Sequence, residues 1–321
     1  MVEPTLRLRH SDMLRAVEEI DLVDVVAQEL IDRAASATDR RPASRLATNH
    51  ASVAATDLTH VGDPDGGRAC LMPTQSLQML CLAGLAGLAA RELLPPGVVT
   101  AAVLGSGAAA RLHLGLVSRY IPNVSHVAVY PGGVEAVQSA EWNVLDGLEL
   151  AGIALSSGTS SQDAALGANL VVVAELGWDR LGLAHLSRGV LVINASRRDL
   201  PEELLTEVDR VYVNDLELLE HNQHRTFVRM HQAGADPRDD QIYRRHEGWF
   251  QRQRSWRHGR RVENDLGHVL AEGGHPRVDN DEVVLVELMA GGALDTRLAG
   301  HIHRAAIALG LGRAVNQTEK E

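Results

Sequence analysis

The stretch from Val98 to Ala110 constrains the fold of this chain more than any other segment. An apolar run, Val-Val-Thr-Ala-Ala-Val-Leu, leads into Gly105-Ser106-Gly107-Ala108-Ala109-Ala110, and an amphipathic stretch follows. This order predicts a strand, a tight glycine turn and a helix. Gly105 is expected to make the turn, and Gly107 to let the backbone approach a pyrophosphate at the helix N-terminus. The segment matches the G-x-G-x-x-G/A pattern of dinucleotide-binding sites; a βα turn without a ligand is the alternative.

Apolar strand candidates alternate with helical segments through the middle of the chain. They are Val98–Leu104, His126–Tyr130, Leu170–Ala174, Val190–Asn194, Arg210–Val213 and Val283–Glu287. Such alternation predicts an α/β protein with a Rossmann-like, doubly wound parallel sheet. Because ligands of such sheets bind beyond the carboxyl ends of the strands, we predict that Tyr130, Glu175 and Asn194 contact the cofactor together with residues 105–110.

The segments on either side of this sheet predict a second, smaller domain. Residues 5–35 and 76–94 have helical patterns, residues 40–65 are polar and irregular, and residues 290–313 form a helix rich in glycine and alanine. We therefore divide the chain into residues 1–96 plus 290–321 and residues 97–289.

The segment from about 221 to 261 differs in charge from the rest of the chain. It contains ten arginines and four acidic residues, whereas the whole chain has a net charge of -11. We interpret it as a basic helical insertion that either steers an anionic or carrier-bound substrate or packs against the acidic remainder or a dimer partner. No recognition motif accompanies it, so nucleic acid is not an expected partner.

The distribution of reactive residues excludes several kinds of chemistry. The only lysine is Lys320, near the C-terminus, which excludes a Walker phosphate loop and a pyridoxal-phosphate site. No H-E-x-x-H or C-x-x-C pattern occurs, and His301 and His303 would point to different faces of a helix, so no metal site is expected. The two cysteines, Cys70 and Cys81, are expected to be buried thiols in a reducing compartment.

The chain shows no membrane or secretion signal in its sequence. It lacks an apolar N-terminal core, and no apolar run approaches the roughly 18 residues needed to cross a bilayer. We therefore expect a cytoplasmic protein without a membrane partner.

Four segments in this order and spacing resemble the ornithine cyclodeaminase and mu-crystallin family. They are Ala89–Leu94, Leu104–Ala110, Asp281–Val286 and Ala308–Val315. The resemblance implies a homodimer built by an α+β dimerisation and substrate domain, residues 1–96 plus 290–321, and an NAD- or NADP-binding domain over residues 97–289. It also implies chemistry on a small molecule at an amino- or imino-bearing carbon, namely imine reduction, amine dehydrogenation or cyclodeamination.

Several positions that are reactive in this family differ here. The family's lysine in the first domain has no counterpart, Cys81-Leu82 replaces an Arg-Thr pair, and Glu287-Leu288 replaces a Lys-Ser pair. A glycine-aspartate loop after the fourth strand looks deleted, since Asn194-Ala195-Ser196 runs almost directly into Asp199. These departures predict an altered substrate pocket, and they leave open a dimer that binds NAD(P)H without turnover.

Three residues are candidates for catalysis: Asp199, Arg45 and Cys81. Asp199 lies just beyond a strand and is able to replace the missing aspartate in proton transfer, or else to cap a helix that begins near Pro201. Arg45 matches the place where the family presents an arginine to a carboxylate, or else is a surface residue. NAD is favoured slightly over NADP, because no arginine follows Tyr130 at the end of its strand.

Overall fold

A computed structural model describes residues 5–38, 57–62, 68–130, 144–175, 181–234, 262–273, 277 and 279–315. It divides the chain into two units, Met1–Gly84 with Ala290–Glu321 and Leu85–Met289. The first boundary therefore falls inside helix α3 (Thr74–Leu93), earlier than residue 96. The dimerisation and dinucleotide-binding roles assigned to the two parts stay predictions.

The first unit is a small α+β structure. Its sheet has the order β12-β1-β3-β2, with β1 (Thr5–Arg7) parallel to β3 (Cys70–Pro73) and the other pairs antiparallel. The remaining strands are β12 (Arg313–Val315) and β2 (Leu58–Val61), and helix α12 (Ala293–Ala308) packs against α1 (His10–Glu18) and α2 (Leu22–Thr38). The helix predicted over 5–35 was wrong in part, because its first residues pair with β12 and β3 as a strand and a break separates α1 from α2.

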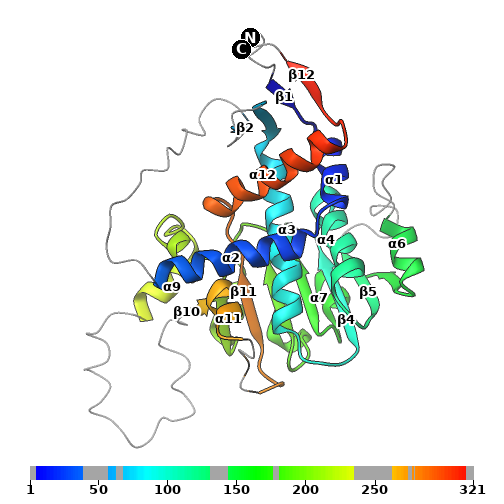
Figure 1. Cartoon of the computed structure of the whole chain (residues 1–321). Helices are drawn as coiled ribbons and strands as arrows, with labels where there is room; N and C mark the ends of the chain where they lie inside the picture. The colour runs from blue at the N-terminus through cyan, green and yellow to red at the C-terminus, as the bar shows by residue number, and fades with distance from the viewer. Residues whose placement is uncertain are drawn as a thin grey trace, which may run out of the picture. The chain divides into compact units, whose positions relative to one another are not determined.

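The second unit contains an eight-stranded parallel sheet with the order β10-β9-β11-β8-β7-β4-β5-β6 (Figure 1). Its strands are β4 (Val99–Leu104), β5 (Val124–Tyr130), β6 (Ala154–Ser157), β7 (Leu170–Val173), β8 (Leu191–Asn194), β9 (Arg210–Val213), β10 (Val262–Asp265) and β11 (Val284–Glu287). The six predicted strands are all present, and β6 and β10 were not predicted. The predicted Rossmann-like, doubly wound sheet is confirmed.

Helices and short helical turns connect these strands. They are α4 (Gly107–Tyr120), α6 (Val144–Leu150), α7 (Ser161–Ala165), η1 (Leu183–His185), α8 (Glu202–Glu207), η2 (Leu216–Leu219), α9 (Thr226–Gly234) and α11 (Leu266–Ala271). One face of the sheet packs on buried residues of α7, α8 and α9, such as Ala165, Leu204 and Val228. Helices α4 and α6 pack side by side, and α4 also contacts β4 (Figure 1). None of the helices in the described ranges is long and apolar enough to cross a membrane.

The strand order reverses direction between β4 and β7. From β4 the chain moves outward through β5 to β6, whereas from β7 it moves the other way to β8. Ligands of doubly wound sheets bind at such a switch point, beyond the carboxyl ends of the strands. Gly105 follows β4 and Glu175 lies two residues after β7, so the fold places the glycine turn at this point.

Candidate functional site

The glycine turn has the backbone geometry that its sequence predicted. Gly105 and Gly107 both have positive φ, at 146° and 66°. A Cβ at Gly105 would lie 2.8 Å from the backbone nitrogen of Glu175, so this position requires glycine for close packing. A Cβ at Gly107 would meet no atom of the described residues within 4 Å, which leaves space for a ligand at the start of α4.

The N-terminus of α4 has donors to offer to an anion. Ser106 is the N-cap residue in an extended conformation, and its side chain makes no capping hydrogen bond. The Ser106 side chain therefore leaves the first backbone N–H groups of the helix uncapped, and these groups carry positive partial charge. Ala110 is buried, in agreement with close packing of the helix, and Ala108 and Ala109 are half-buried. This turn fits the pyrophosphate of a dinucleotide.

Two of the other predicted cofactor contacts lie beside this turn. The Ser106 hydroxyl donates to Glu175 Oε2 at 3.3 Å, so an exposed carboxylate lies beside the N-cap residue of α4. Tyr130 ends β5, accepts a hydrogen bond from Gly105 N through its carbonyl oxygen and is half-buried. Residues 131–143, where a ribose-binding side chain would follow, lie outside the described part of the chain.

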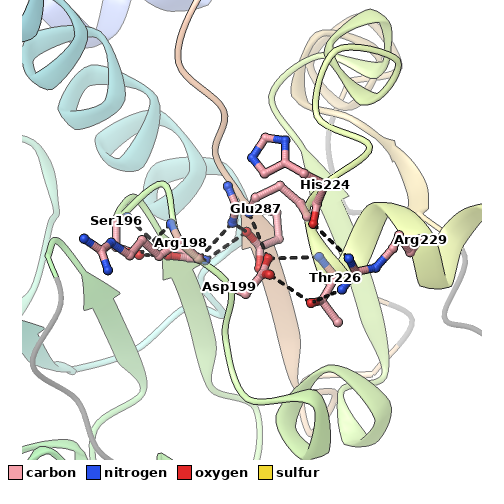
Figure 2. Close-up of polar contacts among 9 residues, drawn as sticks. Ser196, Arg198, Asp199, His224, Thr226, Arg229 and Glu287 are labelled. Atoms are coloured by element: carbon pink, nitrogen blue, oxygen red, sulfur yellow. Dashed lines mark hydrogen bonds and ion pairs between the residues drawn. The ribbon is translucent and has the colours of Figure 1, made fainter.

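A second group of polar residues gathers at the carboxyl ends of β8 and β11 (Figure 2). Its members are joined by hydrogen bonds and ion pairs, and we call them the carboxyl-edge network. They are Asn194, Ser196, Arg198, Asp199, Arg225, Thr226 and Glu287.

Asn194 ends β8 and shapes the loop that follows. Its side-chain nitrogen donates to Glu287 Oε2 at 2.9 Å and to the carbonyl oxygen of Arg198 at 2.7 Å. Its side-chain oxygen accepts from the backbone nitrogen and the hydroxyl of Ser196. Both amide hydrogens are thus used inside the protein, so this side chain, which we predicted to contact a cofactor, is committed to the loop.

Arg225 is the buried cation of the network. Its side chain is only 4% exposed. Nε donates to Asp199 Oδ1 at 3.0 Å, and Nη2 donates to Glu287 Oε2 at 2.8 Å and to the carbonyl oxygen of Arg198 at 2.9 Å. The planar guanidinium can satisfy these three acceptors at once because its donors point in fixed directions.

Glu287 is a fully buried carboxyl group at the end of β11. Oε2 accepts from Asn194 and Arg225, whereas the buried Oε1 has no hydrogen-bond partner among the described residues. Burial raises the pKa of Glu287 to about 7, although Arg225 and the amide of Asn194 oppose this change. The protonated form of this carboxyl group is therefore favoured more than it is in an exposed glutamate.

Asp199 is the member of the network that reaches the surface as a carboxylate, since its side chain is 38% exposed. It is not the N-cap residue of α8, because Pro201 occupies that position and makes no side-chain capping hydrogen bond. Instead it accepts hydrogen bonds from the backbone nitrogen and hydroxyl of Thr226, the first residue of α9. Partial burial raises the pKa of Asp199, but the hydrogen bonds from Thr226 and the contact with Arg225 outweigh it and hold the pKa below its usual value.

The remaining catalytic candidates are Arg45 and Cys81. Arg45 is outside the described residues. Cys81 belongs to the first unit, where burial, followed by the Asp295 carboxylate, raises its pKa well above the usual value, so a reactive thiolate is disfavoured. Both cysteines are free and buried, as expected. On α12, His303 is buried and His301 is partly exposed, and no group of side chains in the described ranges is arranged to hold a metal ion.

Sequence reasoning pointed to residues 194–198, Asp199 and Glu287, but it missed Arg225 and Thr226 as members of the carboxyl-edge network. It had named Asp199 and Asn194, and Glu287 only as a replacement for a lysine. Arg225 and Thr226 were counted only as part of a basic segment. A signal was present at Glu287, because a charged residue closes the apolar run Val283–Val286 at the edge of the sheet where ligands bind.

The sheet order and the glycine turn define a Rossmann-like, doubly wound class of α/β fold. No protein-family model matches the chain, and no curated protein matches its sequence. Solved structures do match. The crystal structure of CmnK has 20% sequence identity and a TM-score of 0.67, covering 98% of this chain and 99% of its own.

Two further structures carry names that bear on the resemblance. The Δ1-pyrroline-2-carboxylate reductase of Thermococcus litoralis, in complex with NADH and L-proline, is 14% identical with a TM-score of 0.65 and covers 97% of this chain and 100% of its own. A probable ornithine cyclodeaminase from Bordetella pertussis Tohama I is 17% identical with a TM-score of 0.62 and covers 96% and 99%. The predicted likeness to the ornithine cyclodeaminase family is confirmed at the level of the fold.

Proposed function

We propose that the protein is an NAD(P)-dependent oxidoreductase that acts at an amino- or imino-bearing carbon of a small molecule. The observation that supports this most directly is the glycine turn at the switch point, where Gly107 leaves the N-terminus of α4 open. The fold shared with a reductase solved with NADH and L-proline supports the same reaction class.

In this proposal, one group of residues binds the cofactor and another stabilises the reacting nitrogen. Gly105, Gly107 and the first turn of α4 bind the pyrophosphate, and the bound nicotinamide supplies hydride acceptance or donation. When an amine carbon loses a hydride, the nitrogen lone pair forms the C=N bond and the nitrogen becomes cationic. Asp199, held as an anion at the same edge of the sheet, stabilises that cation and accepts its N–H hydrogen bond.

Three finer assignments accompany the proposal. We favour NAD over NADP, because Tyr130 at the end of β5 offers no positive charge to a 2'-phosphate. We propose a homodimer, on the resemblance to the cyclodeaminase family. Two free, buried cysteines are in keeping with a reducing compartment, and we propose the cytoplasm.

Cofactor binding is tested with Gly107→Arg and a matched control, Gly152→Arg. Gly152 has nearly the same φ, 68°, and equally open space around its Cβ, but it precedes β6 at the amino edge of the sheet. Calorimetric titration with NADH and NADPH should show saturable binding to the wild type and to Gly152→Arg, and none to Gly107→Arg. Equal affinity of the two variants would contradict the proposed cofactor site.

Turnover is tested by NAD(P)H absorbance against a panel of cyclic imines, amino acids and keto acids. Reduction of an imine or oxidation of an amine supports the proposal. Cofactor binding without any absorbance change would instead favour a non-catalytic NAD(P)H-binding protein. Formation of proline from ornithine would identify a cyclodeaminase and show that the altered positions do not prevent that reaction.

A further inference from the structure

Asp199 is the one carboxylate of the carboxyl-edge network that is open to solvent. The side chain of Glu287 is fully buried and that of Arg225 nearly so, whereas more than a third of Asp199 is exposed. A ligand at this edge of the sheet can therefore reach Asp199 but not the two groups behind it.

Both oxygens of Asp199 are held in place by one short segment of chain. Oδ1 accepts from Arg225 Nε and from the backbone nitrogen of Thr226, each at 3.0 Å, and Oδ2 accepts from the Thr226 hydroxyl at 2.8 Å. Arg229 Nη2 in turn donates to that hydroxyl at 3.0 Å (Figure 2). A carboxylate with several donors remains ionised and has little freedom to rotate.

Arg225 is held just as firmly on its other side. Its Nη2 donor is shared between Glu287 Oε2 and the carbonyl oxygen of Arg198, and its guanidinium carbon lies 5.2 Å from the centre of the Phe227 ring. Glu287 is fixed by Asn194, the residue paired with it across β8 and β11. A continuous chain of contacts thus runs from two strand ends to the exposed carboxylate.

We propose that Arg225 is a positioning residue, which Glu287 holds in place so that Arg225 fixes the Asp199 carboxylate toward the reacting nitrogen of the substrate. This inference rests on the proposed function. It adds that the geometry of the reaction depends on a buried arginine that touches neither substrate nor cofactor. It also gives a role to the buried ion pair of Glu287 and Arg225, which is not part of the glycine turn.

The first test measures the ionisation of Asp199 in the full-length protein by carbon-detected nuclear magnetic resonance of its carboxyl group. Arg225→Gln should raise the pKa of Asp199 by about one unit or more, because a charge and a hydrogen bond are lost. Arg225→Lys should raise the pKa of Asp199 by less, because lysine keeps the positive charge but lacks the planar guanidinium group. Arg210→Gln breaks the pair between Arg210 and Glu282 at the amino ends of the strands, and it should leave the pKa of Asp199 unchanged.

A second variant covers the case in which Arg225→Gln does not fold. Thr226→Val removes a hydroxyl donor to Asp199 at a half-buried position and should raise the pKa of Asp199 by a smaller amount. The proposal would be overturned if the pKa of Asp199 were unchanged in Thr226→Val and Arg225→Gln either left this pKa unchanged or did not fold.

The second test uses the amine or imine that the substrate panel identifies. Arg225→Gln should lower kcat by about tenfold or more and move the acidic limb of the pH–rate profile upward, while the affinity for NADH stays within about twofold. Arg225→Lys should recover part of the activity. Unchanged kcat with a raised pKa of Asp199 would overturn the positioning role. Failure of the wild type to bind NADH would instead overturn the proposed function and leave the ionisation result standing.

Discussion

Two arginine–glutamate pairs lie at the amino edge and at the carboxyl edge of the same parallel sheet, that is, at opposite ends of its strands. They consist of the same residue types but differ in burial. Arg210 begins β9 and donates through Nε to Glu282, two residues before β11, at 2.9 Å. Arg225 and Glu287 form the other pair, at the carboxyl end of β11 and at 2.8 Å. Side chains of the first pair are 23% and 17% exposed, whereas those of the second are 4% and 0% exposed.

The difference in burial changes what an ion pair does. An exposed pair is screened by water and contributes about 0–1 kcal/mol to stability. A buried pair has lost its hydration, and this cost offsets the attraction between the two charges; removing one partner then leaves a buried charge without compensation. The same two residue types therefore form a partly exposed contact at the amino edge and a rigid support at the carboxyl edge, next to the exposed Asp199 carboxylate.

The largest expected effect is that of Arg225→Met, which keeps the side-chain volume but removes the buried charge. Glu287 is then left without its counter-charge, and the free energy of unfolding at about pH 8 should fall by about 3–5 kcal/mol. At about pH 5 the loss should be smaller, because Glu287 can take up a proton and become neutral. Urea unfolding followed by far-ultraviolet circular dichroism measures both values. A loss that is equal at both pH values would show that the charge of Glu287 is not its cause.

Glu287→Gln is expected to have the next largest effect, and of opposite sign. The pKa of Glu287 in the folded protein, about 7, is above the ordinary value of 4.5, so the folded state binds the proton more tightly than the unfolded state. The stability that this group contributes is complete below about pH 4.5 and is lost as the pH rises through about 7. Glutamine mimics the protonated acid, and its NH2 group can take the place of the unpartnered Oε1.

The free energy of unfolding of Glu287→Gln should therefore equal that of the wild type near pH 5. Near pH 8 it should be higher than the wild-type value by up to roughly 3 kcal/mol. Thermal unfolding of both proteins across this pH range measures the difference in stability. Other titrating groups are common to both proteins and cancel in the comparison; one example is His113, whose pKa is lowered to about 4 by burial. A variant that is less stable than the wild type at the higher pH would mean that the attraction of Arg225 outweighs the burial of Glu287.

The two edges also differ in how far their features could be predicted from sequence. The glycine turn was predictable because strand, glycines and helix are contiguous, and its two φ angles follow from local sterics. The strands of the sheet interior were found because they are short apolar runs. Strand β6, Ala154–Ser157, was not predicted because its side chains are largely exposed, and it pairs with β5 as an edge strand of the described sheet.

The carboxyl-edge network could not be assembled in the same way. Arg225 contacts Asp199 and Glu287, which are 26 and 62 residues away in the chain, and nothing near Arg225 in sequence distinguishes it from the other arginines of its segment. Asp199 was found from its position after a strand, but its partner was expected to be α8 and is α9. Position in a sheet is a local property of the sequence, whereas choice of partner depends on the packed structure.

The smallest expected effect is that of Arg210→Gln, and it is the reference for the other two. Arg210 also lies 3.9 Å from Glu263, so its charge is shared between two partly exposed carboxylates. Because water can solvate both carboxylates once the arginine is gone, the free energy of unfolding should fall by less than about 1 kcal/mol, and by the same amount near pH 5 and pH 8. Added salt should reduce the loss further. If this variant instead lost as much stability as Arg225→Met, burial would not explain the contrast between the two edges, and the carboxyl-edge pair would be no more special than its counterpart at the amino edge.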